Sequence, residues 1–338
     1  MTILSDLASL DEVAELIAKL PNLDEDARQA AEARQMILTK PPGALGRLEA
    51  LAIFMAGWQQ TERPEIKKAQ ALIFAGNHGV CAQGVNAFPQ EVTAQMVLNF
   101  EAGGAAINQL CKANGAELSV IALDLDSPTG DITETVAMSD AETLDAMQRG
   151  AAAVDTDADV LILGEMGIGN TTIASALSHG TFGQDAAGWV GLGTGVDDAG
   201  LQRKVDAVSR AVERHTGATG LNRLAALGGR EQAAICGAVL EARANRIPVI
   251  LDGFICTAAT APLFEADNTA LAHCMVGHVS REPGHQRLLA AMALEPILSL
   301  DMALGEGSGA ALSLGILRSA LACHNGMATF AEAGVADG

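Results

Sequence analysis

The sequence predicts an α/β fold, a parallel β-sheet wrapped by helices with a smaller helical domain beside it. Short apolar runs with the length of buried strands alternate with segments of helical periodicity. Hydrophobic residues make up 49% of the 338 residues, enough for a sizeable core. The two ends of the chain lack strand-like runs. We therefore expect residues 1–60 and 312–338 to form the small domain together, and residues 61–311 to form the α/β domain.

Composition excludes several classes of function. The chain has 21 Lys and Arg against 41 Asp and Glu, a net charge of −20, which argues against binding to nucleic acid or to anionic membranes. The six cysteines are scattered without a Cys-x-x-Cys pair, as expected of small core residues in a reducing compartment. The N-terminus lacks the basic and apolar segments of a signal peptide. We expect a cytoplasmic protein.

The N-terminal part of the chain is expected to be helical over residues 5–38. Apolar residues recur there at helical spacing: Leu7, Leu10, Val13 and Ile17. The stretch KPPGALGRLE at 40–49 then forms a rigid turn, because its prolines and glycines interrupt the helical pattern. A helix over about residues 45–59 follows.

Five apolar runs are expected to form the sheet. They are residues 69–75, 117–125, 158–163, 247–251 and 271–276. Parallel strands present their carboxyl ends at one edge, where open α/β sheets bind ligands. His78, just past the first run, is a candidate donor there, although a histidine bonded to a neighbouring backbone group is an equal alternative. Residues 127–157 hold two helical segments or a long connection, and a long helix begins near Gly309.

The most informative local pattern is GEMGIGNTT at 164–172, a glycine-rich loop between a strand and a helix. Amide groups at a helix N-terminus, together with the helix dipole, make an anion site. The loop matches neither a Walker A sequence nor Gly-x-Gly-x-x-Gly. It favours a phosphate site that takes no nucleoside triphosphate, and plain helix capping is the alternative. The phosphate- or ribose-binding candidates are Gly167, Ile168, Gly169, Asn170 and Thr171.

A second glycine loop, GLGTGVDD at 191–198, precedes a helix that carries Lys204. Asp197 or Asp198 is expected to cap that helix. Lys204 can reach a phosphate, or it can simply be solvated. His273, Cys274, His278 and His285 match no zinc-binding spacing. We therefore expect no metal and no cofactor.

A single carboxylate, Glu306, lies among glycines in LGEGSGAA at 304–311, with apolar runs on both sides. An acid in apolar surroundings has a raised pKa, which suits a general base. The alternative is an acid at a helix start, stabilised by the helix dipole.

Taken together, these motifs resemble the nicotinate-nucleotide–dimethylbenzimidazole phosphoribosyltransferases, which make the lower-ligand nucleotide of cobalamin. The matching stretches, in the family's order, are KPPGALGRLE (40–49), NHGV (77–80), FPQEVTAQMV (88–97), GEMGIGNTT (164–172), KVD (204–206), LDGF (251–254), GHVSREPGH (277–285) and LGEGSGAA (304–311). Two departures are mild. Asn77 stands where some members have Asp, and Phe88 stands where others have a different residue.

The resemblance implies phosphoribosyl transfer from nicotinate mononucleotide to 5,6-dimethylbenzimidazole, giving α-ribazole 5′-phosphate and nicotinate. It places the benzimidazole beside Glu306 and the ribose phosphate on the 164–172 loop and Lys204. It further implies a homodimer, a Rossmann-like sheet, and a small helical domain built from both termini.

The chemistry of this transfer needs one base. The attacking imidazole must lose a proton, and a buried carboxylate such as Glu306 can accept it. The leaving nicotinate is already cationic at its ring nitrogen and needs no acid. Glu165 either stabilises positive charge at C1′ or binds a ribose hydroxyl. Candidates for the base pocket, each with ordinary packing as its alternative, are Phe88, Pro89, Gln95, Met96, Met166 and Leu304.

Three other functions compete with this transfer. A Rossmann oxidoreductase needs a dinucleotide fingerprint followed by an acid about 20 residues on, and neither is found in register. The same transfer to another lower-ligand base is an alternative within the family. A non-catalytic phosphosugar-binding protein is disfavoured by the presence of Glu306.

Overall fold

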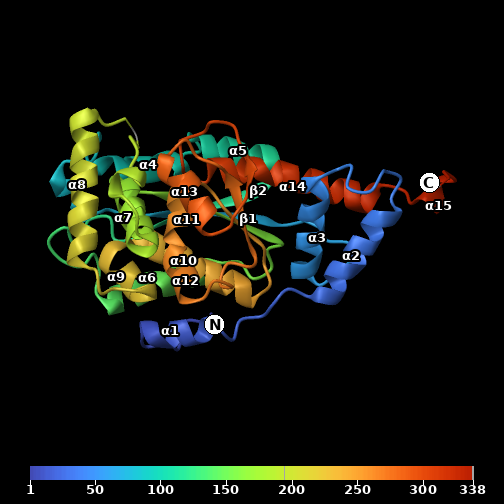
Figure 1. Ribbon diagram of the computed structural model, residues 1–338, viewed down its shortest axis with the longest axis horizontal. Coiled ribbons are helices and arrows are strands. Elements are labelled where there is room, and N and C mark those ends of the chain that lie inside the picture. The colour runs from blue at the N-terminus through green and yellow to red at the C-terminus, as the bar shows by residue number, and fades with distance from the viewer. Residues whose placement is uncertain (194, 337–338) are drawn as a thin grey trace.

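The computed structural model describes residues 1–193 and 195–336. Thr194 of the 191–198 loop and the last two residues of the expected small domain, 337–338, lie outside the described residues. A six-stranded parallel sheet with strand order β2-β1-β3-β4-β5-β6 forms the centre of the molecule (Figure 1). The strands are β1 (Ala69–Ala75), β2 (Ala116–Ala122), β3 (Val160–Met166), β4 (Val249–Leu251), β5 (Cys274–His278) and β6 (Pro296–Leu298). The expected α/β class is confirmed.

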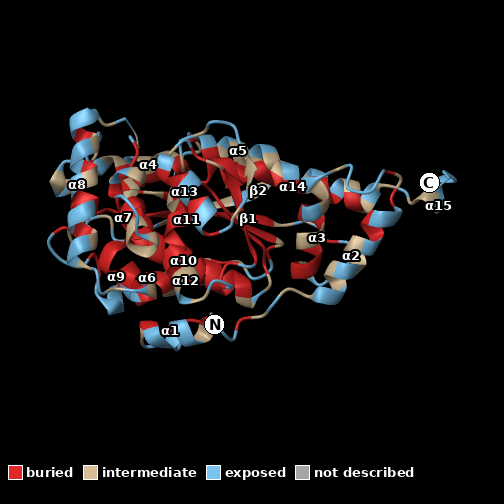
Figure 2. Ribbon diagram, viewed as in Figure 1, coloured by how far each residue is buried: buried red, intermediate tan, exposed pale blue. Residues whose placement is uncertain are grey.

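The central strands are buried on both faces because successive side chains point to opposite sides of a sheet. Leu72 and Phe74 of β1 belong to one apolar cluster, together with Leu163 of β3. Ile73 of β1 and Ile162 of β3 belong to a second cluster on the other face. Figure 2 shows the sheet and the inner surfaces of its helices as buried. The continuous apolar runs of the sequence therefore reflect strands covered from both sides.

Helices cover both faces of the sheet. The helices are α1 (Leu10–Ile17), α2 (Glu25–Ile37), α3 (Arg47–Gln59), α4 (Glu91–Glu101), α5 (Ala106–Asn114), α6 (Asp140–Ala152), α7 (Asn170–Phe182), α8 (Asp198–Arg214), α9 (Gly220–Leu227), α10 (Arg230–Ala244), α11 (Phe254–Ala259), α12 (Ala261–Ala266), α13 (Pro283–Ala291), α14 (Ser308–Gly326) and α15 (Phe330–Ala333). Helices α10 and α11 pack on one face, and α5 and α14 on the other. Residues 127–157 contain one helix, α6, after a long connection.

Segments from the N- and C-terminal parts of the chain meet at the tapered end of the molecule, where α2 and the end of α14 both pack on α3 (Figure 1). Arg34 of α2 donates from Nε to the carbonyl of His324 at 2.8 Å. Helix α1 does not join this group. It packs on α9, and the Ile3 amide donates to Glu241 of α10 at 2.8 Å. The boundaries of the two expected domains remain a prediction.

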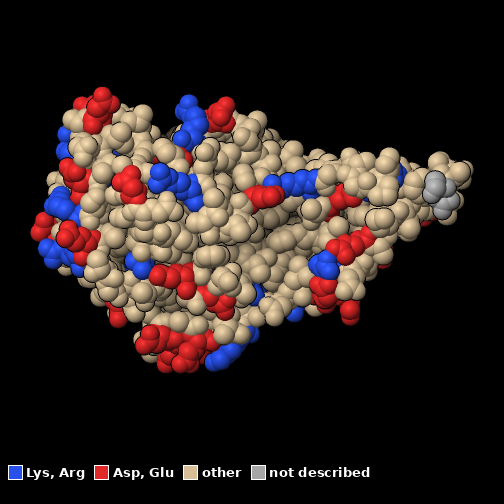
Figure 3. Space-filling model, viewed as in Figure 1, with Lys and Arg blue, Asp and Glu red and all other residues tan. Residues whose placement is uncertain are grey.

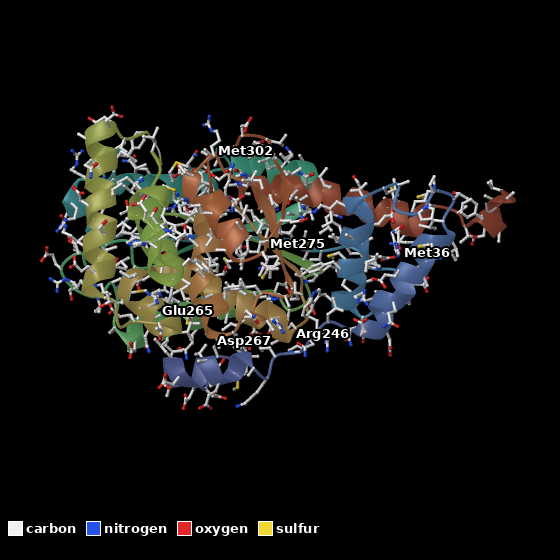
Figure 4. The ribbon with its side chains drawn as sticks, viewed as in Figure 1. Met36, Arg246, Glu265, Asp267, Met275 and Met302 are labelled. Atoms are coloured by element: carbon white, nitrogen blue, oxygen red, sulfur yellow. The ribbon has the colours of Figure 1, made fainter. Side chains whose placement is uncertain are left out.

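The distribution of charged side chains on the surface reflects the excess of acidic residues in the sequence. Acidic side chains gather over α1, and much of the visible face carries no charge (Figure 3). The side chains labelled in Figure 4 include Met275 of β5, which lies within the second core cluster, and Met36 of α2, which is 60% exposed at the tapered end. Within the two described ranges, no helix combines the length and apolar character needed to cross a membrane.

Candidate active site

The candidate site lies at the carboxyl edge of the sheet. The chain continues from β1 to β2 on one side and then to β3 on the other, and such a reversal opens a crevice beyond the strand ends. A cavity of about 280 Å³ opens there. Its wall includes Glu165 near the end of β3, Asp252 just after β4, His278 at the end of β5, and Glu306 after β6.

Glu306 is held in an unusual turn. Gly305, Glu306 and Gly307 have φ values of +80°, +60° and +75°. The left-handed conformation costs a residue with a Cβ about 1 kcal/mol, so Glu306 is held there by its surroundings. The chain also passes very close to β3, because a Cβ on Gly305 would lie 2.7 Å from Oε1 of Glu165. The glycines on either side of Glu306 thus serve both the turn and the close approach.

The electrostatics suit proton transfer at Glu306. The residue is 9% exposed. Burial, followed by the charge of Asp252, raises the pKa of Glu306 to about 7. A base is most effective when its pKa lies near the working pH. The raised pKa of Glu306 agrees with the expectation drawn from its glycine-rich and apolar surroundings in the sequence.

Glu165 is a second buried acid in the cavity. Burial raises the pKa of Glu165 well above its ordinary value, and the carboxylates of Asp252, Glu231 and Glu306 add to the effect. Asn170 donates a side-chain hydrogen bond to Oε2 of Glu165. Asn170 is the first residue of α7, so the glycine loop orients this acid as well as forming the cavity wall.

The glycine loop separates the main cavity from a smaller recess of about 30 Å³. Gly167, Ile168, Asn170 and Thr171 line both spaces, whereas Gly169 lines the recess only. The amide of Ile168 already donates to Oγ1 of Thr93 at 3.1 Å. The Asn170 amide likewise donates to the carbonyl of Gly167 at 3.1 Å, so both amides are already engaged within the protein.

Lys204 lines the recess and is buried, which rules out the solvated alternative. Its Nζ donates to Oγ1 of Thr171 at 3.0 Å and to the carbonyl of Gly191 at 2.8 Å. Burial lowers the pKa of Lys204 to about 8, against an opposing effect of Glu282. Asp197 caps α8, the helix that carries Lys204, by accepting from the Gly200 amide at 2.7 Å, as expected.

One wall of the main cavity is apolar. Four of the six candidates for the base pocket line it: Phe88, Met96, Met166 and Leu304. The structure does not bring Pro89 or Gln95 to this wall, and both are exposed. Gln95 faces solvent because the inward positions of α4 are Thr93, Val97 and Phe100.

Comparisons with known proteins identify the family. A sequence-family model described as phosphoribosyltransferase matches residues 20–335. A nicotinate-nucleotide–dimethylbenzimidazole phosphoribosyltransferase of Rhodobacter capsulatus is 61% identical over 97% of this chain and 98% of its own length. A protein of the same name from Mesorhizobium japonicum is 55% identical over 97% of this chain and 98% of its own.

The chain belongs to the nicotinate-nucleotide–dimethylbenzimidazole phosphoribosyltransferase family. The family resemblance seen in the motifs is thereby confirmed, and the protein is a pentosyltransferase. The crystal structure of CobT from Thermus thermophilus is 40% identical, covers 93% of this chain and 100% of its own, and superimposes with a TM-score of 0.87.

Several residues of the cavity were given no role from the sequence alone. They are Val92, Gly193, Asp252, Gly253, Phe254, Ile255, His278, Ser280, Glu282, Ala303 and Gly305. Many belong to two motifs that this family resemblance rests on, LDGF (251–254) and GHVSREPGH (277–285). Both motifs follow or end a strand, and that position at the carboxyl edge was the signal that could have found them.

Two of the scattered histidines bond to backbone groups of the protein. His273 bonds through Nε2 to the carbonyl of Val239 at 2.9 Å, and Nδ1 of His285 accepts from the Ser280 amide at 2.9 Å. Over residues 1–193 and 195–336, no group of three or more His, Cys, Asp or Glu side chains is arranged to hold a metal ion.

Proposed function

We propose that this chain transfers the 5-phosphoribosyl group of nicotinate mononucleotide to 5,6-dimethylbenzimidazole. The products are α-ribazole 5′-phosphate and nicotinate. The observation that carries the proposal is the place of Glu306, whose carboxylate has a pKa of about 7 and lines a cavity with an apolar wall. An aromatic base needs such a wall, and its ring proton needs such an acceptor. The names of the relatives support the same two substrates.

Glu306 acts as the general base in this proposal. One imidazole nitrogen attacks C1′ of the ribose while the other gives its proton to Glu306. The bond from C1′ to the nicotinate nitrogen breaks, and nicotinate leaves with the bonding electron pair as a neutral ring nitrogen. Attack from the opposite face converts the β to the α configuration. The phenyl ring of Phe88 and the side chains of Met96, Met166 and Leu304 hold the acceptor against the base.

The phosphate is assigned to the recess beside the glycine loop. Lys204 and Thr171 line it and provide a cation and a hydroxyl group, which suit phosphate. The ribose then spans Gly167 to Thr171, the residues shared by both spaces, with C1′ in the main cavity near Glu165. Glu165 stabilises positive charge developing at C1′ when it is ionised, or binds a ribose hydroxyl. Holding both substrates in line contributes several kcal/mol to catalysis.

We also propose that the enzyme is a cytoplasmic homodimer. Large apolar side chains outside the cavity lining stay exposed in the single chain, among them Leu98, Val136 and Leu300, and exposed apolar surface favours an interface. All six cysteines are free thiols, which suits a reducing compartment.

The replacement Glu306→Gln tests the proposed base. Glutamine keeps the size of the side chain but cannot accept the proton, so turnover is expected to fall by about 100-fold or more. Binding of nicotinate mononucleotide, measured by calorimetry, should persist. If the Glu306→Gln enzyme keeps its turnover, Glu306 is not the base. If it loses both nucleotide binding and the fold, Glu306 has a structural role.

A further inference from the structure

Asp252 is buried at the point where three elements meet. It follows β4 and is 1% exposed. Its Oδ2 accepts from the amide of Gly307 at 3.1 Å, and its Oδ1 accepts from the amide of Ala310 at 2.8 Å. These amides belong to the N-terminus of α14, where backbone donors have no partner within the helix. Asp252 thus caps α14 from another part of the chain.

Both hydrogen bonds hold the backbone directly after the residue that carries the proposed chemistry. Glu306 immediately precedes Gly307, and all three residues from 305 to 307 have left-handed φ values. An arrangement that costs energy in isolation must be held by its neighbours. Here the neighbour is a carboxylate that binds the backbone on the far side of the turn, so the position of Glu306 depends on Asp252.

Asp252 also places a carboxylate close to Glu306. The titratable groups that line the cavity with Glu306 are Glu165 of β3, Asp252 after β4, His278 of β5, and Glu282 just before α13. Nε2 of His278 lies 3.7 Å from Oδ1 of Asp252. Burial raises the pKa of Asp252, while His278 and the amides of 307, 309 and 310 oppose that effect. The amides and His278 thus favour the ionised form of Asp252.

We propose that Asp252 is a positioning residue for Glu306, holding the 305–307 turn by two backbone hydrogen bonds and placing a second negative charge behind the Glu306 carboxylate. The inference rests on the proposed function, because it assigns Asp252 a role only through Glu306. The charge makes Glu306 a stronger base, since a nearby like charge disfavours ionisation. This role of Asp252 gives a physical reason for the LDGF motif at 251–254.

The test compares Asp252→Asn with the wild-type enzyme in the dependence of kcat/KM on pH. Asparagine is nearly isosteric but uncharged. The acidic limb of the wild type is expected near pH 7, at the pKa of Glu306, and in Asp252→Asn it should move down by about one pH unit. The plateau should fall about ten-fold or more as the turn loosens. Asp24→Asn is the matched control. It removes the charge of an aspartate that caps α2, in the distant helical group, and should leave both limb and plateau unchanged.

An unshifted limb in a folded Asp252→Asn enzyme overturns the inference, while Glu306→Gln separately decides whether Glu306 is the base. If Asp252→Asn does not fold, amide hydrogen exchange in the wild type decides the geometry. The Gly307 and Ala310 amides should exchange at least about 100-fold more slowly than in an unstructured peptide. Exchange of these amides at the unstructured rate contradicts the proposed hydrogen bonds.

Discussion

Nε2 of His78 lies 3.1 Å from Oε1 of Glu231, and neither side chain is exposed to solvent. His78 follows β1 and Glu231 lies in the first turn of α10. The imidazole also lies directly under the glycine loop, because Nε2 would be 3.0 Å from a Cβ placed on Gly167. His78, in the NHGV motif at the end of β1, therefore packs against the glycine loop that follows β3.

Breaking this pair should destabilise the fold. Glu231→Gln leaves His78 buried without a carboxylate partner, at a cost of about 2 kcal/mol or more. The melting temperature should fall by about 3 °C or more. Glu15→Gln, on the exposed face of α1, is the control and should melt with the wild type. Equal melting temperatures for both variants would show that the pair contributes nothing.

Nucleotide affinity should weaken at alkaline pH. Burial lowers the pKa of Lys204 to about 8, so the free enzyme loses this positive charge as the pH rises through 8. The KM for nicotinate mononucleotide should rise above that pH in the wild type. In Lys204→Met it should be raised about ten-fold or more at pH 7, and its dependence on pH near 8 should disappear. Lys112→Met, at an exposed position on α5, should match the wild type. An unchanged KM in Lys204→Met contradicts the phosphate assignment.

The apolar wall should control the affinity for the acceptor base alone. Phe88→Ala removes an aromatic face from the cavity, which is worth about 1 kcal/mol. The KM for dimethylbenzimidazole should therefore rise about five-fold, with the KM for nicotinate mononucleotide unchanged. Met36→Ala, an exposed site on α2, serves as the control. If the nucleotide KM rises instead, Phe88 belongs to the other subsite.

The carboxylate of Glu306 should lower stability at neutral pH. Its pKa is about 7 in the folded protein against an ordinary value of 4.5, so the folded state binds the proton more tightly. Stability from this group is greatest below pH 4.5 and is lost as the pH rises to about 7. Glu306→Gln should melt about 2 °C or more above the wild type at pH 8, with the difference closing near pH 4.5. A lower melting temperature at pH 8 excludes a destabilising charge at this position.

Much of the sheet could be predicted because strands covered on both faces leave continuous apolar runs. The first five strands fall at or within a few residues of the expected runs. Strand β6 was missed because it has only three residues, Pro296–Leu298, all of them half-buried. An apolar run of only three residues is too short to be distinguished from a loop.

The lining of the cavity could be predicted where neighbouring residues in the sequence form it. Glu306 and the 164–172 loop carry their glycines beside them, so the motif reveals the geometry. Asp252 and Glu231 do not, because their partners, Gly307 and His78, are distant in sequence and meet only through the order of the strands. The same limit explains Gln95, whose helix pattern left open which face of α4 turns toward the cavity.

The product assay tests the central claim most directly. Purified protein is mixed with nicotinate mononucleotide and dimethylbenzimidazole, without added metal, and the products are resolved by mass and anomeric configuration. Free nicotinate and an α-linked benzimidazole ribotide are expected in equal amounts, and nicotinate release should require the benzimidazole. Nicotinate released without the coupled product, or nucleotide bound without turnover, contradicts the proposed transfer.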